Sequence, residues 1–195
     1  YLYGPSRSSR TGDDTYTISS IEPSFIWDGG GIDTISAEGC NQSCTIFLTP
    51  GFWGFAGSSR ASLITAPGQI TVNFGSIIEN LTGSSYADKL FGTDGENTIN
   101  GGAGNDTLTG GAGNEFTYTA GATTAVVAAT NSITTSGTGN KVTLTQDGGT
   151  GSGHSTTIDG SAGGSNNTFA ITQAGTSGNS IVSIKASGSG NTVTV

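Results

Sequence analysis

The stretch that decides the fold consists of four consecutive nonapeptides: GSSYADKLF (83–91), GTDGENTIN (92–100), GGAGNDTLT (101–109) and GGAGNEFTY (110–118). Each unit divides into a six-residue turn and a three-residue strand. Leu90, Ile99 and Leu108 share one strand position, so we expect them to form an apolar stack in the interior, and Thr117 holds that position in the fourth unit. Glycine, acid and apolar residue repeat in one register, which a glycine-rich linker would not do. The repeat therefore predicts a parallel β-solenoid.

The turns of these units carry the pattern of a cation site. Gly101, Gly102 and Gly104 permit backbone angles that are closed to residues with a Cβ, so carbonyl oxygens can point inward. Two units make one coil, which places the turn of Asp88 against the turn of Asp106. Calcium prefers about six to eight hard oxygen ligands, and the carbonyls and carboxylates of two adjacent turns would provide them. The sequence predicts a calcium site here.

A second site is expected on the opposite edge, where Asn97 would meet Glu115. Asn97 is neutral and Glu115 is longer than the usual aspartate, so we predict an altered or vacant site. The candidate ligand residues of the four units are Gly83, Ser85, Asp88, Gly92, Asp94, Asn97, Gly101, Ala103, Asp106, Gly110, Ala112 and Glu115.

Composition also favours an all-β solenoid. Glycine accounts for 34 of 195 residues, charged residues for only 10%, and methionine is absent, which disfavours helices. Hydrophobic residues make up 32%, too few for a thick globular core but enough for a thin stack repeated along one axis. We predict two joined units, a β-roll over 1–118 and a second β-solenoid over 119–195.

The net charge of −8 disfavours nucleic acids and anionic membranes as partners and favours cations. No apolar run is long enough for a membrane span, and YLYGPSRSSR (1–10) lacks the apolar segment of a signal peptide. We therefore expect a truncated or processed chain, or export by a route that reads the C-terminus.

Two further features precede the nonapeptides. Cys40 and Cys44 predict a local disulfide, with two free thiols in a loop as the alternative. Between Cys44 and Asn73 we predict two strands and an aromatic-rich loop around Trp53. The rings would cap the end of the solenoid; the alternative is an exposed ligand platform.

Upstream, WDGGGIDTIS (27–36) looks like half a nonapeptide. Asp28, Gly30 and Asp33 would bring two carboxylates and a carbonyl together, while Ile32 and Ile35 would anchor the strand.

Four segments then follow in an informative order: LYG (2–4), RTGDDTYTI (10–18), IWDGGGIDTIS (26–36) and the run from SIIENL (76–81) into the nonapeptides. Over residues 2–118 this series resembles the C-terminal, nonapeptide-repeat (RTX) domain of serralysin-type metalloproteases. The resemblance implies a domain that folds on binding calcium, follows a catalytic domain and assists export through a type I channel. It also implies calcium ligands, largely carbonyls, at the positions of Arg10, Gly12, Asp13, Asp28, Gly30 and Asp33.

The chain departs from that family in one decisive respect. It has no H-E-x-x-H zinc motif, and its single histidine, His154, could not furnish one. His154 also lacks distinctive partners for a hydrolase triad. We predict that this chain is not an enzyme, although a parent protein could be a metalloprotease.

A different repeat follows the nonapeptides: NKVTLTQDGG (140–149), a degraded copy HSTTIDGSAGGSN (154–166), NTFAITQAGTSG (167–178), NSIVSIKASGSG (179–190) and NTVTV (191–195). Alternation directs four pairs of residues inward: Val142 and Leu144, Phe169 and Ile171, Ile181 and Ile184, and Val193 and Val195. Recurrent asparagines, together with Gln146 and Gln173, suit a ladder of side-chain amides along the axis. From about residue 131 this part resembles curlin repeats.

The last segment, NTVTV, carries no charge, proline or bulge, so its free edge would readily pair with another chain; harmless fraying of a free C-terminus is the alternative. The leading prediction is a secreted structural or adhesive module, bacterial and exported by a type I-like route. It would fold on extracellular calcium and self-associate, even into filaments, through its C-terminal coils. The alternatives are the secretion and folding domain of a serralysin-like protease and a glycan- or surface-binding module.

Overall fold

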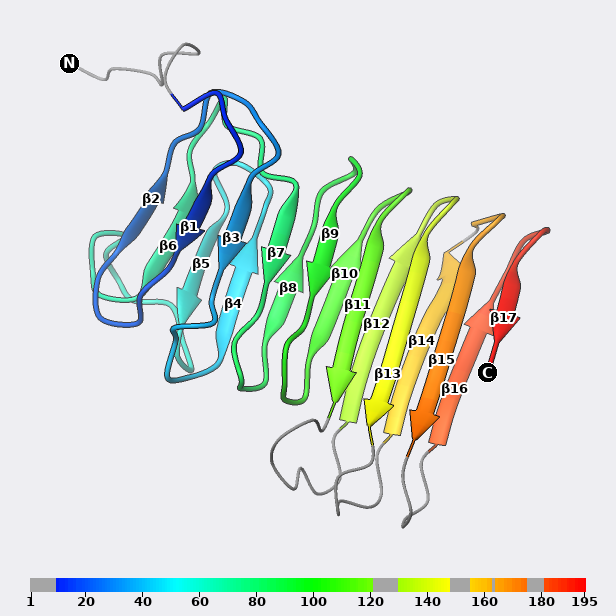
Figure 1. Cartoon of the computed structure of the whole chain (residues 1–195). Coiled ribbons are helices and arrows are strands. Elements are labelled where there is room, and N and C mark those ends of the chain that lie inside the picture. Colours follow the sequence, from blue (N-terminus) through cyan, green and yellow to red (C-terminus); the bar gives the residue numbers. More distant parts are fainter. Residues whose placement is uncertain (1–9, 121–129, 148–154, 163, 175–180) are drawn as a thin grey trace.

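The structure is a computed structural model that describes residues 10–120, 130–147, 155–162, 164–174 and 181–195. Within them the chain forms two sheets that face each other along one axis (Figure 1). The first sheet contains, in order, β1 (Thr15–Thr17), β3 (Thr34–Ser36), β7 (Asn80–Thr82), β9 (Thr98–Asn100), β11 (Glu115–Ala120), β13 (Lys141–Asp147), β15 (Thr168–Ala174) and β17 (Thr192–Thr194). The second contains β16 (Ile181–Ala186), β14 (Ser155–Ala162), β12 (Thr130–Ser136), β10 (Thr107–Gly110), β8 (Lys89–Phe91), β4 (Cys44–Phe47), β5 (Trp53–Ala56), β6 (Gln69–Val72) and β2 (Ser24–Ile26).

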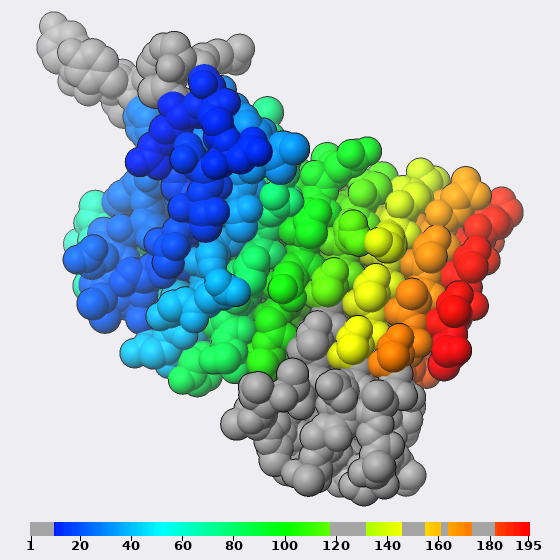
Figure 2. Space-filling view, viewed as in Figure 1, coloured from blue at the N-terminus to red at the C-terminus, as the bar shows by residue number. Residues whose placement is uncertain are grey.

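From β7 onward, successive strands alternate between the sheets, so each coil contributes one strand to each and the neighbours are parallel. This confirms the predicted all-β solenoid fold, with no helix among the described residues and therefore none that could span a bilayer. Figure 2 shows the coils as successive bands from the blue N-terminal end to the red C-terminal end.

The apolar stack lies between the sheets. Leu90, Ile99 and Leu108 are completely buried, as predicted. In the fourth nonapeptide the buried residue is Phe116, and Thr117, predicted there, is partly exposed. The reason is a shift of one residue, because Glu115 rather than Phe116 pairs with the first residue of β9. Upstream, Ile35 is buried as predicted, whereas Ile32 is exposed in the turn.

Residues 44–72 depart from the regular coil. They form three strands where two were predicted, and β5 pairs antiparallel with both β4 and β6. Gly54 makes this possible, since a Cβ there would lie 2.4 Å from the carbonyl oxygen of Thr45. Trp53 is held within this insertion: its Nε1–H donates to Gln69 Oε1 at 2.7 Å, and Arg60 lies 4.7 Å over its ring. These strands lie within the second sheet, between β8 and β2, and the role of the aromatic loop as a cap stays a prediction.

The C-terminal coils continue both sheets without a break in pairing, since β11 joins β9 to β13 and β10 joins β8 to β12. Four predicted interior residues are buried there: Val142, Leu144, Phe169 and Ile171. The division at residue 118 stays a prediction, as does the resemblance to curlin repeats.

In β16, Val182 and Ile184 pack against the core. Ile184 thus faces the core as predicted, Val182 does so in addition, and the side chain of Ile181 lies outside the described residues. Val193 and Val195 are 50% and 87% exposed, since no further coil covers them. Segments used in the predictions above that lie outside the described residues are LYG (2–4), His154 and parts of the C-terminal repeats (148–149, 163 and 175–180).

Candidate metal centre

Turns of two kinds join the sheets. Those leading from the second sheet into the first form the upper edge in Figure 1 and include 27–33, 92–97, 110–114, 136–140 and 187–191. Those leading from the first sheet into the second, 83–88 and 101–106, form the lower edge. A buried or partly buried polar residue precedes the first-sheet strands and also β8 and β10, and these residues carry the chemistry of the site.

A compact acidic cluster lies at the N-terminal end of the upper edge. Asp14, Asp28 and Asp33 each offer a carboxylate oxygen, and these oxygens lie within 4.8 Å of one another. Asp28 and Asp33 are 1% and 0% exposed. Burying three carboxylates together is costly unless a cation or protons balance their charge.

The hydrogen bonds of Asp33 define where such a cation belongs. Its Oδ1 accepts the Asp14 N–H at 2.8 Å, whereas its buried Oδ2 has no hydrogen-bond partner. Its own N–H donates to Glu79 Oε2 at 2.8 Å. Burial raises the pKa of Asp33 to about 6, and the neighbouring carboxylate of Asp28 adds to the rise. The residues fit a hard divalent cation, whose ligands are oxygens.

The cluster is held together by close backbone contact between two segments. The Gly29 N–H donates to the Arg10 carbonyl at 3.0 Å, and the Ile32 N–H donates to Asp13 Oδ1 at 2.8 Å. Gly31, at φ +141°, lies where a Cβ would be 2.4 Å from the Gly12 carbonyl oxygen.

The candidate residues Arg10, Gly12, Asp13, Asp28, Gly30 and Asp33 thus come together. In place of Asp13, however, it is Asp14 whose carboxylate joins the cluster. The Asp13 carboxylate instead caps the facing turn.

The lower edge brings Asp88 and Asp106 together, as predicted. Both are 1% exposed, and the Asp88 N–H donates to Asp106 Oδ1 at 2.9 Å. The backbones of their turns also touch, since a Cβ on Gly83 would lie 2.3 Å from the Gly101 carbonyl oxygen. Such proximity suits a cation shared by two turns.

The two aspartates differ in their surroundings. Asp88 accepts hydrogen bonds from the Ser84 N–H and hydroxyl and from the Cys44 N–H, at 2.6 to 3.0 Å. In the next turn Gly102 replaces the serine, so no hydroxyl is available at that position. Burial raises the pKa of Asp88, and it raises the pKa of Asp106 to about 8. Asp106 is the acid on this edge whose charge most needs a cation.

On the upper edge of the nonapeptides, the residue that faces Asn97 is not the predicted Glu115 but its neighbour. Asn114, fully buried, takes the position facing Asn97, and the Glu115 side chain points outward to Lys141, with Oε1 and Nζ 2.5 Å apart. The expectation that Glu115 supplies the second acid is therefore wrong, because the fourth turn is one residue shorter than the third.

The remaining candidates lie in the same turns. Gly83, Gly101 and Gly110 are buried, Gly92 and Ala103 are partly buried, and Ser85, Asp94 and Ala112 are exposed. Exposed side chains do not prevent their carbonyls from acting as ligands, and the assignment of individual carbonyls stays a prediction.

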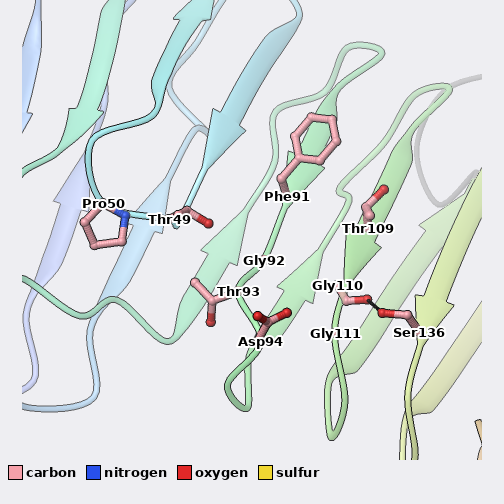
Figure 3. A pocket seen from close by; sticks show the side chains of 10 residues that line it. All are labelled: Thr49, Pro50, Phe91, Gly92, Thr93, Asp94, Thr109, Gly110, Gly111 and Ser136. Atoms are coloured by element: carbon pink, nitrogen blue, oxygen red, sulfur yellow. Dashed lines mark hydrogen bonds between the residues drawn. The ribbon is translucent and has the colours of Figure 1, made fainter.

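An open groove of about 390 Å³ lies on the second sheet, near the upper edge (Figure 3). Its lining comprises Thr49, Pro50, Phe91, Gly92, Thr93, Asp94, Thr109, Gly110, Gly111 and Ser136. The Phe91 ring stacks on Phe47 with centroids 4.6 Å apart, and the Ser136 hydroxyl donates to the Gly110 carbonyl at 3.2 Å. The groove is open, and its lining exposes more apolar than polar surface.

Cys40 and Cys44 are free thiols in the structure, contrary to the predicted disulfide, and both are buried. A hydrogen bond with Cys40, followed by burial, raises the pKa of the Cys44 thiol. The Cys44 N–H donates a hydrogen bond to Asp88 and so connects the cysteine loop to the lower edge.

Comparison with known proteins agrees with this geometry. The family model described as the RTX calcium-binding nonapeptide repeat, in four copies, matches residues 82–114. These residues are RTX calcium-binding repeats. Serralysin G of Dickeya chrysanthemi is 32% identical over 105 residues, which cover 47% of this chain. The match extends over 21% of that relative, so the chain corresponds to about a fifth of its length. Calcium is therefore the cation that the RTX turns bind.

Asp14 and Glu79 were missed as site residues. Both immediately precede a first-sheet strand, as Asp33 does, in DTYT (14–17), ENLT (79–82) and DTIS (33–36). The acid before a short strand was the available signal.

Proposed function

We propose that this chain is a secreted, non-catalytic calcium-binding module that folds stably only where calcium is plentiful. The supporting observation is the cluster of the partly buried Asp14 with the buried Asp28 and Asp33, and the unpartnered Asp33 Oδ2 inside it. Resemblance to a serralysin and the RTX repeats support a bacterial, exported protein.

The mechanism is linkage between binding and folding. Asp14, Asp28 and Asp33 would hold one ion, and Asp88 with Asp106 would hold another, together with turn carbonyls. Bound calcium supplies the positive charge that offsets carboxylate burial and repulsion. Since the unfolded chain has no preformed site, each ion stabilises only the folded state, by RT ln(1 + [Ca²⁺]/Kd).

Circular dichroism and thermal unfolding with calcium or a chelator test this proposal. Wild type should gain β-structure and stability with calcium, and Asp33→Asn should reduce the gain. Glu96→Gln, an exposed acid in an RTX turn, is the matched control and should respond as wild type does. Folding that is unchanged by the chelator in wild type would overturn the proposal.

Self-association through the C-terminal coil extends the proposal to a structural role. In the described residues β17 pairs only with β15 and β16 only with β14, which leaves two strand edges open. Val193 and Val195 lie uncovered beside them. A second copy of this chain is the proposed occupant, because uncharged strand edges pair readily with like strands.

Light scattering after size-exclusion chromatography, with calcium present, measures this association. Wild type should form oligomers, and Val193→Lys should be monomeric because it places a charge at the open end. Thr98→Lys, exposed on a strand paired on both sides, is the control. A monomeric wild type would remove the structural role while leaving the calcium-binding function intact.

The second candidate is the folding and export module of a serralysin-like protease, favoured by the 32% identity with Serralysin G. Fusing the chain to an inactive reporter and measuring type I-dependent export tests it. Reporter retained inside the cell despite a functional exporter would count against this candidate.

A further inference from the structure

A single column of polar residues runs along the upper edge from one end of the solenoid to the other. Each member precedes a first-sheet strand, and the strand pairing places them in one line: Asp14, Asp33, Glu79, Asn97, Asn114, Asn140, Asn167 and Asn191. The first three are acids and the last five are asparagines. The column therefore changes from anionic to neutral along the axis.

One hydrogen bond is common to both parts of the column. The N–H of one member donates to the side-chain oxygen of the next: Asp14 to Asp33, Asn114 to Asn140, Asn140 to Asn167 and Asn167 to Asn191, at 2.8 to 3.0 Å. Acids and amides can both accept this bond through an oxygen. These hydrogen bonds along the column therefore do not distinguish acids from asparagines.

The NH2 group of the asparagine amide, which a carboxylate lacks, does distinguish asparagines from acids. Asn140 Nδ2 donates to the Ser136 carbonyl at 3.0 Å, to the Gly137 carbonyl at 3.4 Å and to Asn167 Oδ1 at 3.1 Å. Asn140 is 1% exposed, so these oxygens meet the amide away from water. Three oxygens thus converge on the buried, neutral NH2 group of one amide, as oxygens converge on a cation.

The last coil repeats this arrangement. Asn191 Nδ2 donates to the Ser187 carbonyl at 3.0 Å and to the Gly188 carbonyl at 3.3 Å. The two turns share the pattern S-G-x-G-N, in SGTGN (136–140) and SGSGN (187–191). Asn114 begins the series with a single bond, from Nδ2 to the Ala112 carbonyl at 3.1 Å.

We propose that the side-chain amides of Asn140 and Asn191 take the place of calcium in the C-terminal coils, where they bind the turn carbonyls that would otherwise need a cation. An amide N–H satisfies an inward carbonyl without adding charge, so these coils fold without metal. The identity of one residue per coil, aspartate or asparagine, thereby decides whether a turn takes calcium. This inference rests on the proposed calcium-binding function of the acidic turns.

Replacing the amide by a carboxylate is the direct test. Asn140→Asp keeps the acceptor for the Asn114 N–H but places a buried charge against three oxygens, so the variant should be destabilised in chelator at neutral pH. Calcium should restore it by a larger increment than it gives wild type. Asn140→Ala removes donor and acceptor and should be equally destabilised with and without calcium.

Asn191→Asp tests the same exchange next to β17, which pairs only with β15 among the described strands, so destabilisation there should leave the other coils folded. Equilibrium dialysis should show one more bound calcium per chain in this variant than in wild type. If both aspartate variants bind no additional calcium and Asn140→Asp is not rescued, the inference is wrong. Wild type that binds no calcium would instead refute the proposed function.

Discussion

Replacing Asp106 by asparagine should make the metal-free protein more stable, although it removes a proposed calcium ligand. Burial raises the pKa of Asp106 from the usual 3.8 to about 8. Each pKa unit corresponds to about 1.4 kcal/mol, so at pH 7.5 the burial of this carboxyl, which stays mostly protonated without metal, costs the metal-free fold roughly 5 kcal/mol. Asp106→Asn relieves that cost and keeps the acceptor for the Asp88 N–H.

The pH dependence has a definite sign. The folded metal-free protein holds the Asp106 proton more tightly than the unfolded chain, so its stability is greatest below about pH 4 and falls as pH rises to about 8. Asp106→Asn should flatten this part of the profile.

Denaturant unfolding in chelator, followed by circular dichroism at several pH values, measures both effects. With calcium present, Asp106→Asn should gain less stability than wild type. Glu96→Gln, exposed in a neighbouring turn, removes the same charge and should shift neither profile nor calcium increment. An Asp106→Asn protein that is less stable than wild type in chelator, with an undiminished calcium increment, would refute the reasoning.

Three further outcomes follow from the packing. Leu108→Ala removes a completely buried side chain of the apolar stack and should destabilise the calcium-bound protein by about 2–5 kcal/mol in denaturant melts. Gly31→Ala should weaken calcium binding in titration calorimetry, because its Cβ would lie 2.4 Å from the Gly12 carbonyl oxygen; unchanged affinity would contradict that contact. Oxidation should join the neighbouring thiols of Cys40 and Cys44 into a five-residue loop worth about 2 kcal/mol, detectable as the loss of two hydrogens by mass spectrometry and as a raised midpoint.

The sequence alone was sufficient where periodicity was strict. Leu90, Ile99 and Leu108 repeat every nine residues, and this spacing predicted both their burial and the facing of Asp88 by Asp106. The solenoid fold and the calcium binding of its RTX turns followed from the same repeat.

Prediction failed where the repeat and the coil differ in length. When the nonapeptides are aligned by sequence, Glu115 of GGAGNEFTY (110–118) corresponds to Asp106. In the structure the shorter turn places Asn114, not Glu115, directly before the strand register shared with β9. The pairing that decides this comes from Lys141, beyond the repeat itself. Asp14 was missed for a related reason: only the register of β1 against β3 distinguishes it from Asp13.

The upper-edge column also bears on how the chain tolerates changes in length. Successive members are separated by 19 residues from Asp14 to Asp33, but by 26, 27 and 24 residues along the asparagine part from Asn114 to Asn191. At each of these four steps the same hydrogen bond joins the two members, and part of the additional length lies in longer strands, since β11 and β13 have six and seven residues whereas β1 and β3 have three. The upper edge therefore keeps one hydrogen-bonded register between neighbouring coils although the coils differ in length, so a longer strand leaves this line of residues intact.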